Sequence, residues 1–542
     1  MRKLTTALFT LLLLCGHIYA QNLPVPKYVK TIDLPMGQLA IEFNGKLYFM
    51  AQNALWVSDG TQNGTQKVTE LGIIEMKVFN GKMYFVANDN TGYDLWESDG
   101  NATGTKKVKD ISAINGRGII TSYIDFTMVT AGSEMFFYAD DGIHGIELWK
   151  TDGTSGGTQM IKDINPAGDI LDTTNGELPK ACIAVMNNKV YFSANDGTTG
   201  PELWVTDGTS SGTHLVKDIY SGTSTFNTGP ERFMLFNGNL IFCANDVNTV
   251  HMYKTDGTDP GTVAIGDTVY STMSDYAIVG NKLFFIGGKG QTTGLMVLDG
   301  TPTGTQLVKE LQLNKIAAGN WGNTGFLVPY NGKVYFPASF ITPPYEYELW
   351  VSDGTDIGTV EFKDVTPAGN FASYPSQLTL FGGHLYFRAR DTGFISKIWR
   401  TDGTDAGTQQ IVYPGSDITS FSGRLVGMTL SRAALIPFGN KLFLGNHWNY
   451  YEGHSLYMLD MFPDKIEDVT DVQFMIYPNP ATEYIYFNKA EWSKIAVHNM
   501  SGQEMEISYT GNSVYIGHLA PGIYILTLSN DHQVVQKNFV KE

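Results

Sequence analysis

The phrase ELWVTDGTSSGTHLVKDI, residues 202–219, recurs in altered form along most of the chain, and this repetition constrains the fold more than any other feature. The pattern Asp-Gly-Thr/Asn-x-x-Gly-Thr begins at eight aspartates, and its second glycine always lies five residues after the aspartate. The eight are Asp59, Asp99, Asp152, Asp207, Asp256, Asp299, Asp353 and Asp402. A decayed ninth copy ends at Asp460. A repeat of about 40–58 residues predicts one supersecondary unit per copy, stacked on its neighbours.

Each copy predicts four short strands. Phrases such as FNGKLYFMA (43–51) and MNNKVYFSA (186–194) contain an Asn-Gly-like pair between apolar runs, which is the strongest short hairpin signal. The ELW strand is apolar on both faces and therefore predicts burial on both faces. The Asp-Gly-Thr loop then leads into a strand of the LVKDI type. Four strands per repeat predict an all-β chain with a single β-propeller of about eight to nine four-stranded blades.

One strand without a unit of its own lies near the N-terminus. The last copy lacks a clear fourth strand, whereas YVKTIDL (28–34) resembles the VKDI strand of the other copies. We expect it to complete the last blade and so hide two strand edges. An open solenoid is the alternative.

The repeated residues have a structural interpretation. One large apolar position recurs before each Asp-Gly pair and predicts packing between blades. It holds Trp56, Trp96, Trp149, Trp204, Trp350 and Trp399. The repeat aspartates suit turns, in which the carboxylate accepts a backbone N–H. The acidic loops NDNTGYD, DDGIHGIE and NDGTTGPE suggest calcium ligands instead, because calcium prefers several carboxylate oxygens. The candidates are Asp89, Asp141 and Asp196, with plain Asx turns as the alternative; no other cofactor is expected.

Charge and cysteine content narrow the function. The net charge of −17 and the lack of clustered Lys and Arg argue against a nucleic-acid partner. Outside the first twenty residues the chain has two cysteines, Cys182 and Cys243. Two buried free thiols are favoured over a disulfide, because Cys243 replaces Ser193 at one repeat position. We expect a monomer.

The first twenty residues have the form of a secretory signal peptide. Arg2 and Lys3 precede an apolar run, and Ala20 precedes the expected cleavage point. A lipoprotein signal at Cys15 is the rival interpretation. We expect no transmembrane segment in the mature chain, because no other stretch approaches eighteen apolar residues.

Residues 471–542 depart from the repeat and predict a small Ig-like β-sandwich. They resemble the C-terminal sorting domain of the type IX (Por) secretion system of Bacteroidota. The matching residues are Tyr477, Pro478, Asn479, Pro480, Gly522, Tyr524, Lys537 and Lys541. The resemblance implies recognition by that machinery, passage through the periplasm, and either release or attachment at the outer-membrane surface. Residues 38–460 resemble the ELWxxDGT-repeat proteins, a name that implies little about activity. The expected domains are therefore 1–20, 21–470 and 471–542.

Function is expected in the longer, irregular connections, since binding residues concentrate on loops of a rigid scaffold. Their aromatic residues suggest stacking on sugars or anchoring of a protein, with packing as the alternative. The candidates are Trp321, Phe340, Tyr345, Tyr347, Trp448, Tyr450 and Tyr451. We expect a secreted or cell-surface binding or adhesion module for a glycan or protein. The alternative is a carbohydrate-active enzyme, although no catalytic motif stands out.

Overall fold

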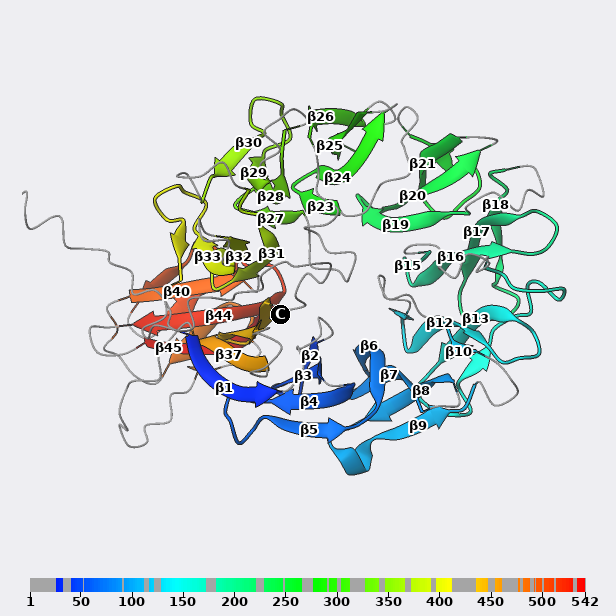
Figure 1. Cartoon of the computed structure of the whole chain (residues 1–542), viewed down its shortest axis with the longest axis horizontal. Helices are drawn as coiled ribbons and strands as arrows, with labels where there is room; N and C mark the ends of the chain where they lie inside the picture. The colour runs from blue at the N-terminus through cyan, green and yellow to red at the C-terminus, as the bar shows by residue number, and fades with distance from the viewer. Residues whose placement is uncertain are drawn as a thin grey trace, which may run out of the picture.

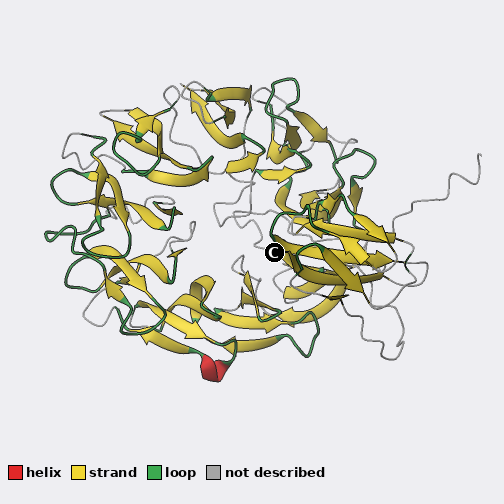
Figure 2. Cartoon of the chain, turned by 180° about the vertical axis from the view of Figure 1, so that it is seen from behind, coloured by secondary structure: helices red, strands yellow, loops and turns green. Residues whose placement is uncertain are grey.

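The chain is nearly all β. The computed structural model describes residues 26–32, 40–460 and 476–541 with internal gaps. The longer gaps are 112–116, 121–127, 172–181, 221–228, 266–275, 312–326, 341–346, 366–371, 391–395, 412–434 and 447–453. In the described part, the only helical element is one 3-10 turn, Ala102–Gly104 (Figure 2). The expected signal peptide lies outside the described residues.

The repeat region forms units of four antiparallel strands, numbered 1–9 in chain order. Unit 1 contains β2 (Ala40–Phe43), β3 (Lys46–Ala51), β4 (Ala54–Ser58) and β5 (Gln66–Thr69). Unit 2 contains β6 (Gly72–Phe79), β7 (Lys82–Asn88), β8 (Tyr93–Ser98) and β9 (Lys106–Lys109). Unit 3 contains β11 (Val129–Ala131), β12 (Glu134–Asp140), β13 (Ile146–Thr151) and β14 (Gln159–Met160). Unit 4 contains β15 (Ile183–Met186), β16 (Lys189–Asn195), β17 (Pro201–Thr206) and β18 (His214–Lys217). Unit 5 contains β19 (Glu231–Phe236), β20 (Asn239–Asp246), β21 (Thr249–Thr255) and β22 (Val263–Ala264).

The later units follow the same plan. Unit 6 contains β23 (Tyr276–Val279), β24 (Lys282–Lys289), β25 (Thr292–Leu298) and β26 (Gln306–Glu310). Unit 7 contains β27 (Val328–Tyr330), β28 (Lys333–Ala338), β29 (Glu348–Ser352) and β30 (Val360–Lys363). Unit 8 contains β31 (Ser376–Phe381), β32 (His384–Arg390), β33 (Ser396–Thr401) and β34 (Gln409–Gln410). Unit 9 contains β35 (Leu435–Phe438), β36 (Lys441–Asn446) and β37 (His454–Asp460). The short strand β10 (Gly118–Ile119) joins units 2 and 3 into one nine-stranded sheet.

The tight hairpin between the first two strands follows from the Asn-Gly-like pair. Asn44 and Gly45 have φ of +50° and +69°, and Asn187 and Asn188 have φ of +52° and +59°. A type I′ turn needs positive φ at both central residues, which asparagine and glycine tolerate best. The predicted hairpin turns are therefore present at these positions.

The units follow one another around a ring, with first strands toward the centre and fourth strands toward the outside (Figure 1). The strand β1 (Pro26–Ile32) pairs antiparallel with β37, opposing Thr31 to Ser455. As predicted, the N-terminal strand supplies the fourth strand of unit 9, in the order β1-β37-β36-β35.

Buried apolar residues fill the space between successive units. One cluster joins Phe192 of unit 4 to Tyr138 of unit 3, and another joins Phe336 of unit 7 to Phe284 of unit 6. The same relationship joins the ends of the repeat region, since Val29 and Phe443 share a cluster with residues of unit 1. Each unit is therefore covered on both faces, which explains strands that are apolar on both sides.

The segment after the repeats forms two further four-stranded sheets. One contains β38 (Ile476–Tyr477), β39 (Tyr484–Phe487), β43 (Ser513–Tyr515) and β42 (Ser508–Thr510). The other contains β41 (Glu504–Met505), β40 (Lys494–Asn499), β44 (Gly522–Ser529) and β45 (Val534–Lys541). Ile485 of the first sheet and Leu526 of the second belong to one buried cluster, so the two sheets share a core.

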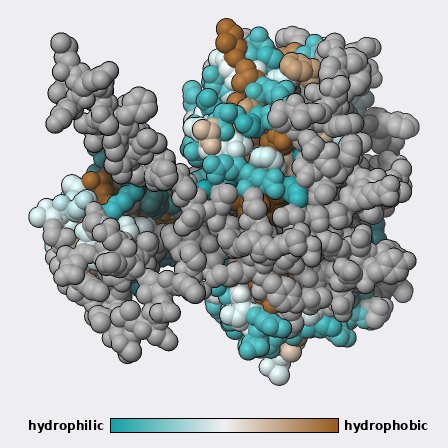
Figure 3. Space-filling view, turned by 60° about the vertical axis from the view of Figure 1, so that its left-hand side comes forward, coloured by the Kyte–Doolittle hydropathy of each residue, from teal (hydrophilic) through white to brown (hydrophobic). Residues whose placement is uncertain are grey.

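No helix in the described part of the chain is long and apolar enough to cross a membrane. The coloured surface in Figure 3 is mainly hydrophilic, with separate brown patches. Cys182 and Cys243 are both buried and are not joined in a disulfide, in agreement with the favoured interpretation.

Candidate functional site

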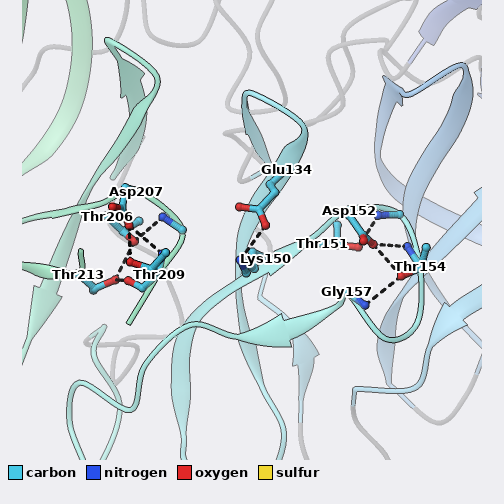
Figure 4. Close-up of polar contacts among 12 residues, drawn as sticks. Glu134, Lys150, Thr151, Asp152, Thr154, Gly157, Thr206, Asp207, Thr209 and Thr213 are labelled. Carbon is cyan, nitrogen blue, oxygen red and sulfur yellow. Dashed lines mark hydrogen bonds and ion pairs between the residues drawn. The ribbon is translucent and has the colours of Figure 1, made fainter. Parts of the chain in front are cut away.

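The Asp-Gly-Thr loops are closed hydrogen-bond networks (Figure 4). In unit 3, Asp152 Oδ1 accepts from the N–H of Thr154 at 2.8 Å and from its hydroxyl at 2.7 Å. The Thr154 hydroxyl oxygen accepts from Gly157 N–H at 2.9 Å, and the Thr151 and Thr158 hydroxyl oxygens are 2.7 Å apart. The Thr154 hydrogen bonds lower the pKa of Asp152 below its ordinary value. Equivalent bonds form at Asp59, Asp207, Asp256, Asp353 and Asp402.

Two repeat aspartates differ. At Asp99, the carboxylate accepts from Asn101 N–H at 2.9 Å. The second bond differs, because asparagine replaces the threonine whose hydroxyl donates in the copies described above. The loop after Asp299 is described only in part.

Sterics explain both glycines of the loop. At Gly157, a Cβ would lie 2.1 Å from Asp152 Oδ1, whereas nothing lies within 4 Å of a Cβ at the neighbouring Gly156. Gly153 has φ +94°, and its Cβ would lie 2.2 Å from the Tyr84 hydroxyl oxygen of the preceding unit. The loop therefore docks onto the unit before it.

A lysine from the preceding unit completes this contact. In units 2, 3, 4, 6 and 7, a lysine at the end of the fourth strand or just after it extends to the next Asp-Gly-Thr loop. Lys109 donates to the Thr158 carbonyl at 2.6 Å, and Lys162 donates to the Thr213 carbonyl at 3.0 Å. Lys309 donates likewise to the Thr359 carbonyl, whereas Lys217 and Lys363 donate to the carboxylates of Asp259 and Asp405 in the equivalent loops. The Asp-Gly-Thr loops and the hairpin turns lie on one face of the repeat region, which we call the uniform face. They act mainly to hold successive units together, and we call each such contact a clasp.

The repeat tryptophans lie beside these clasps. Trp350 is 1 % exposed, and Trp56, Trp149 and Trp204 are 6–8 % exposed. Trp96 and Trp399 are partly buried. The arrangement corresponds to packing between units.

The candidate calcium residues make local contacts. The Asp89 carboxylate lies 2.8 Å from Lys107 Nζ. Asp141 Oδ1 accepts from His144 N–H at 3.0 Å, and Asp196 Oδ1 accepts from Thr198 N–H at 2.8 Å. Within the described residues, no group of three or more His, Cys, Asp and Glu is placed to hold a metal ion. These contacts are those of an ion pair and of Asx turns.

The acidic residue of ELW is buried, which the repeat pattern did not lead us to predict. Glu202 accepts from Ile219 N–H at 2.7 Å and from Tyr220 N–H at 3.1 Å, and so fixes the chain after the fourth strand. Burial raises the pKa of Glu202 to about 7. Glu147 and Glu348 are equivalent, and burial raises the pKa of each to about 7. The sequence signal that could have led to this prediction is the charged residue that recurs directly before Leu-Trp.

Opposite the uniform face lies the variable face, which carries the connections from second to third strand and from each unit to the next. At the junction of units 7 and 8, the ring of Tyr347 stacks on that of Tyr374, with centroids 5.7 Å apart. The Arg390 guanidinium carbon lies 4.8 Å from the Tyr374 ring centroid. We call these three residues the junction site.

Hydrogen bonds fix the chain at the junction site. Tyr374 N–H donates to the Tyr347 carbonyl at 3.0 Å, and Arg390 N–H donates to the Ser373 carbonyl at 2.7 Å. Ser373 N–H also donates to buried Glu348 at 2.7 Å. Tyr374 is 37 % exposed. Partial burial lowers the pKa of Arg390 from its ordinary value. The site therefore presents a half-exposed aromatic ring and a cation on a fixed backbone.

The two described aromatic candidates lie on opposite sides of unit 7. Phe340 is 49 % exposed and packs edge-on against Trp350, which belongs to the cluster with unit 6. Tyr347 instead contacts the chain that enters unit 8. Trp321, Tyr345, Trp448, Tyr450 and Tyr451 lie outside the described residues. Sequence reasoning missed Tyr374 and Arg390; the SYPS stretch just before β31 was the only available hint.

The residues that carry the resemblance to the sorting domain differ in how deeply they are buried. Tyr524 is buried, donates its hydroxyl to the Ala520 carbonyl at 2.9 Å and stacks on Phe539. Gly522 pairs with Lys541, which is buried, whereas Lys537 is exposed. Tyr477 lies in β38. Pro478, Asn479 and Pro480 lie outside the described residues.

A comparison with known families concerns the same segment. Residues 475–542 match the secretion system C-terminal sorting domain. A sorting tail of this kind indicates a secreted cargo of the type IX system, destined for secretion or the cell surface. No curated protein matches the chain.

Solved structures give only distant similarities. A puromycin hydrolase is 13% identical with a TM-score of 0.34, covering 64% of this chain and 54% of that one. Oligopeptidase B from Leishmania major is 11% identical with a TM-score of 0.35, covering 64% and 49%. PorZ, described as a surface component of the type-IX secretion system of Porphyromonas gingivalis, is 9% identical with a TM-score of 0.24, covering 96% and 100%. The chain spans about half the length of the first two, and at these scores none carries an argument here.

Proposed function

We propose that residues 26–460 form one closed propeller of nine blades within a domain spanning 21–470. Three observations support this: the four-stranded units, the clusters between successive units, and the pairing of β1 with β37. Lys441 of unit 9 also donates to the Asp59 carbonyl of unit 1 at 2.9 Å. This is the type of contact that Lys282 of unit 6 makes with Asp353 of unit 7 at 3.0 Å.

The rest of the chain serves export in this proposal. Residues 1–20 direct the chain to the periplasm and are removed. Residues 471–542 form an Ig-like sandwich that the type IX machinery recognises at the outer membrane. The family match and the shared core of the two C-terminal sheets support this route. The propeller then acts at the cell surface or after release.

The propeller acts there as a binding or adhesion module for a glycan or protein. The observation that carries this proposal is the junction site on the variable face, where Tyr347 and Tyr374 come from two separate connections and Arg390 is the last residue of β32. Aromatic rings and arginine dominate recognition surfaces because they bury much area at small entropic cost. On the uniform face, in contrast, the Asp-Gly-Thr loops and hairpin turns are taken up by contacts between units.

Binding of the purified protein to glycan and protein arrays tests this function. We expect saturable binding that falls at least tenfold in Tyr374→Ala and is unchanged in Ile357→Ala, an exposed residue of the uniform face. Loss in both variants, or in neither, would place binding elsewhere. The enzyme alternative is tested by turnover on the same glycans.

A further inference from the structure

We propose that the junction site binds an acidic sugar residue, with the Arg390 guanidinium on the sugar carboxylate and tyrosine rings against the sugar face. This inference rests on the proposed function as a glycan-binding module and names the ligand class.

Arg390 differs from Arg117 in its surroundings. Among the described residues it has no ion pair and no side-chain hydrogen bond; its guanidinium contacts the Tyr374 ring. Arg117, by comparison, pairs with Asp140 at 2.8 Å and with Asp169 at 2.9 Å. An arginine without a carboxylate partner among the described residues is notable in a chain with 54 acidic and 37 basic residues. Because stacking uses the flat face of the guanidinium, its N–H edge is left for a planar anion such as a carboxylate.

The site is also built in advance. Tyr374 has φ +47° although it is not glycine and precedes a proline, which is an unfavourable backbone conformation. The bonds from Tyr374 N–H to Tyr347 and from Arg390 N–H to Ser373 hold it there. Strained residues held by their surroundings concentrate at binding sites, because a fixed geometry reduces the entropy lost on binding.

The bordering strands favour a sugar over a peptide. β29 lies between β28 and β30, and β32 lies between β31 and β33, so neither has an open edge. A peptide therefore cannot add to β29 or β32 as a strand; the edge strand nearest the site is β31, which lies toward the centre of the ring. The exposed part of the Tyr374 ring and the Arg390 guanidinium remain, and these match the C–H groups and the carboxylate of a uronic acid.

The net charge limits the ligand further. At −17, the protein repels a densely charged polymer at long range. An oligosaccharide with one uronic acid among neutral sugars keeps the local contact and avoids most of that repulsion. Such an oligosaccharide is therefore the probe.

The test compares an oligosaccharide of neutral sugars that carries one glucuronic acid with the same molecule after its carboxylate has been reduced to the alcohol. Titration calorimetry with the whole protein measures both affinities. We expect the acidic form to bind about tenfold or more tightly than the reduced form. Arg390→Gln should abolish this difference but keep the affinity for the reduced form. Arg390→Lys should retain part of it, because lysine keeps the charge and loses the fork.

Lys46→Gln is the matched control, since it removes one exposed positive charge on the uniform face. It should leave the difference intact; an equal effect would mean general electrostatics and overturn the site. Equal affinity of the wild type for both forms would overturn the acidic ligand while the glycan function stands. Binding of neither form, with acidic peptides bound instead through Arg390, would also overturn it. The absence of binding to every glycan and every protein on the arrays would remove the proposed function as well. Unchanged melting temperatures exclude misfolding as the cause.

Discussion

Lys162 Nζ lies 5.7 Å from the centroid of the Trp204 ring in the next unit. The same ammonium group donates to the Thr213 carbonyl in the Asp-Gly-Thr loop of that unit at 3.0 Å. One lysine thus contacts two parts of the repeated phrase, the tryptophan and the loop. The phrase recurs because its lysine, tryptophan and loop come from successive units and together form one interface.

Replacing this lysine should weaken a single interface. Lys162→Met keeps the apolar stem but removes a cation–π contact and a charged hydrogen bond, so we expect a loss of about 1–2 kcal/mol. Urea unfolding measures it. Lys46→Met, at an exposed lysine, should change stability by less than about 0.5 kcal/mol. Equal midpoints for both variants would mean that the clasp contributes nothing measurable.

The two adjacent glycines of the unit 3 loop provide a matched pair. Gly157→Ala would place a Cβ 2.1 Å from Asp152 Oδ1, so the loop must shift; we expect a destabilisation of about 1–3 kcal/mol. Gly156→Ala meets nothing within 4 Å and should be neutral or slightly stabilising. Thermal unfolding of the two variants side by side provides the measurement. The same effect for both would contradict the steric explanation.

Much of the fold could be predicted from local sequence. Asn44–Gly45 specifies a hairpin turn through its dihedral angles, and the YVKTI strand resembles the missing fourth strand closely enough to predict its pairing. The junction site could not be predicted in this way. Tyr347 and Tyr374 lie in two connections and Arg390 ends β32, with no shared motif, and their contact depends on how units 7 and 8 pack. The role of Glu202 was missed for a related reason: the charged residue before Leu-Trp recurs in the sequence, but its partners are backbone amides, which no side-chain pattern specifies.

The buried glutamates predict a pH dependence of stability. Burial raises the pKa of Glu147, Glu202 and Glu348 from 4.5 to about 7. Because the folded-state pKa is raised, the stability that each protonated glutamate contributes is fully present below about pH 4.5. It is lost as the pH rises through 7. Each glutamate contributes at most about 3 kcal/mol. The loop aspartates have lowered pKa values, so their contribution is lost only at acidic pH, below their unfolded value.

We therefore expect the melting temperature to fall between pH 5.5 and 8. Differential scanning calorimetry across this range measures the fall. Glu202→Gln removes one of the three groups and should reduce the fall by about a third. A melting temperature that is constant or rises over this range would show that these carboxyl groups are ionised in the folded protein at little cost.

Ring closure by β1 gives the last prediction. Val29 is 1 % exposed in the cluster that joins units 9 and 1, and β1 covers the edge of β37. Deleting residues 21–32 leaves that edge open and the cluster incomplete, so we expect concentration-dependent self-association in size-exclusion chromatography. A synthetic peptide of residues 24–34 should bind the truncated protein and restore the monomer, because strand addition replaces the missing pairing. The same peptide with Val29→Asp is the control and should fail, since it would bury an unpaired charge. A truncated protein that stays monomeric without peptide, with unchanged stability, would mean that β1 does not close the ring.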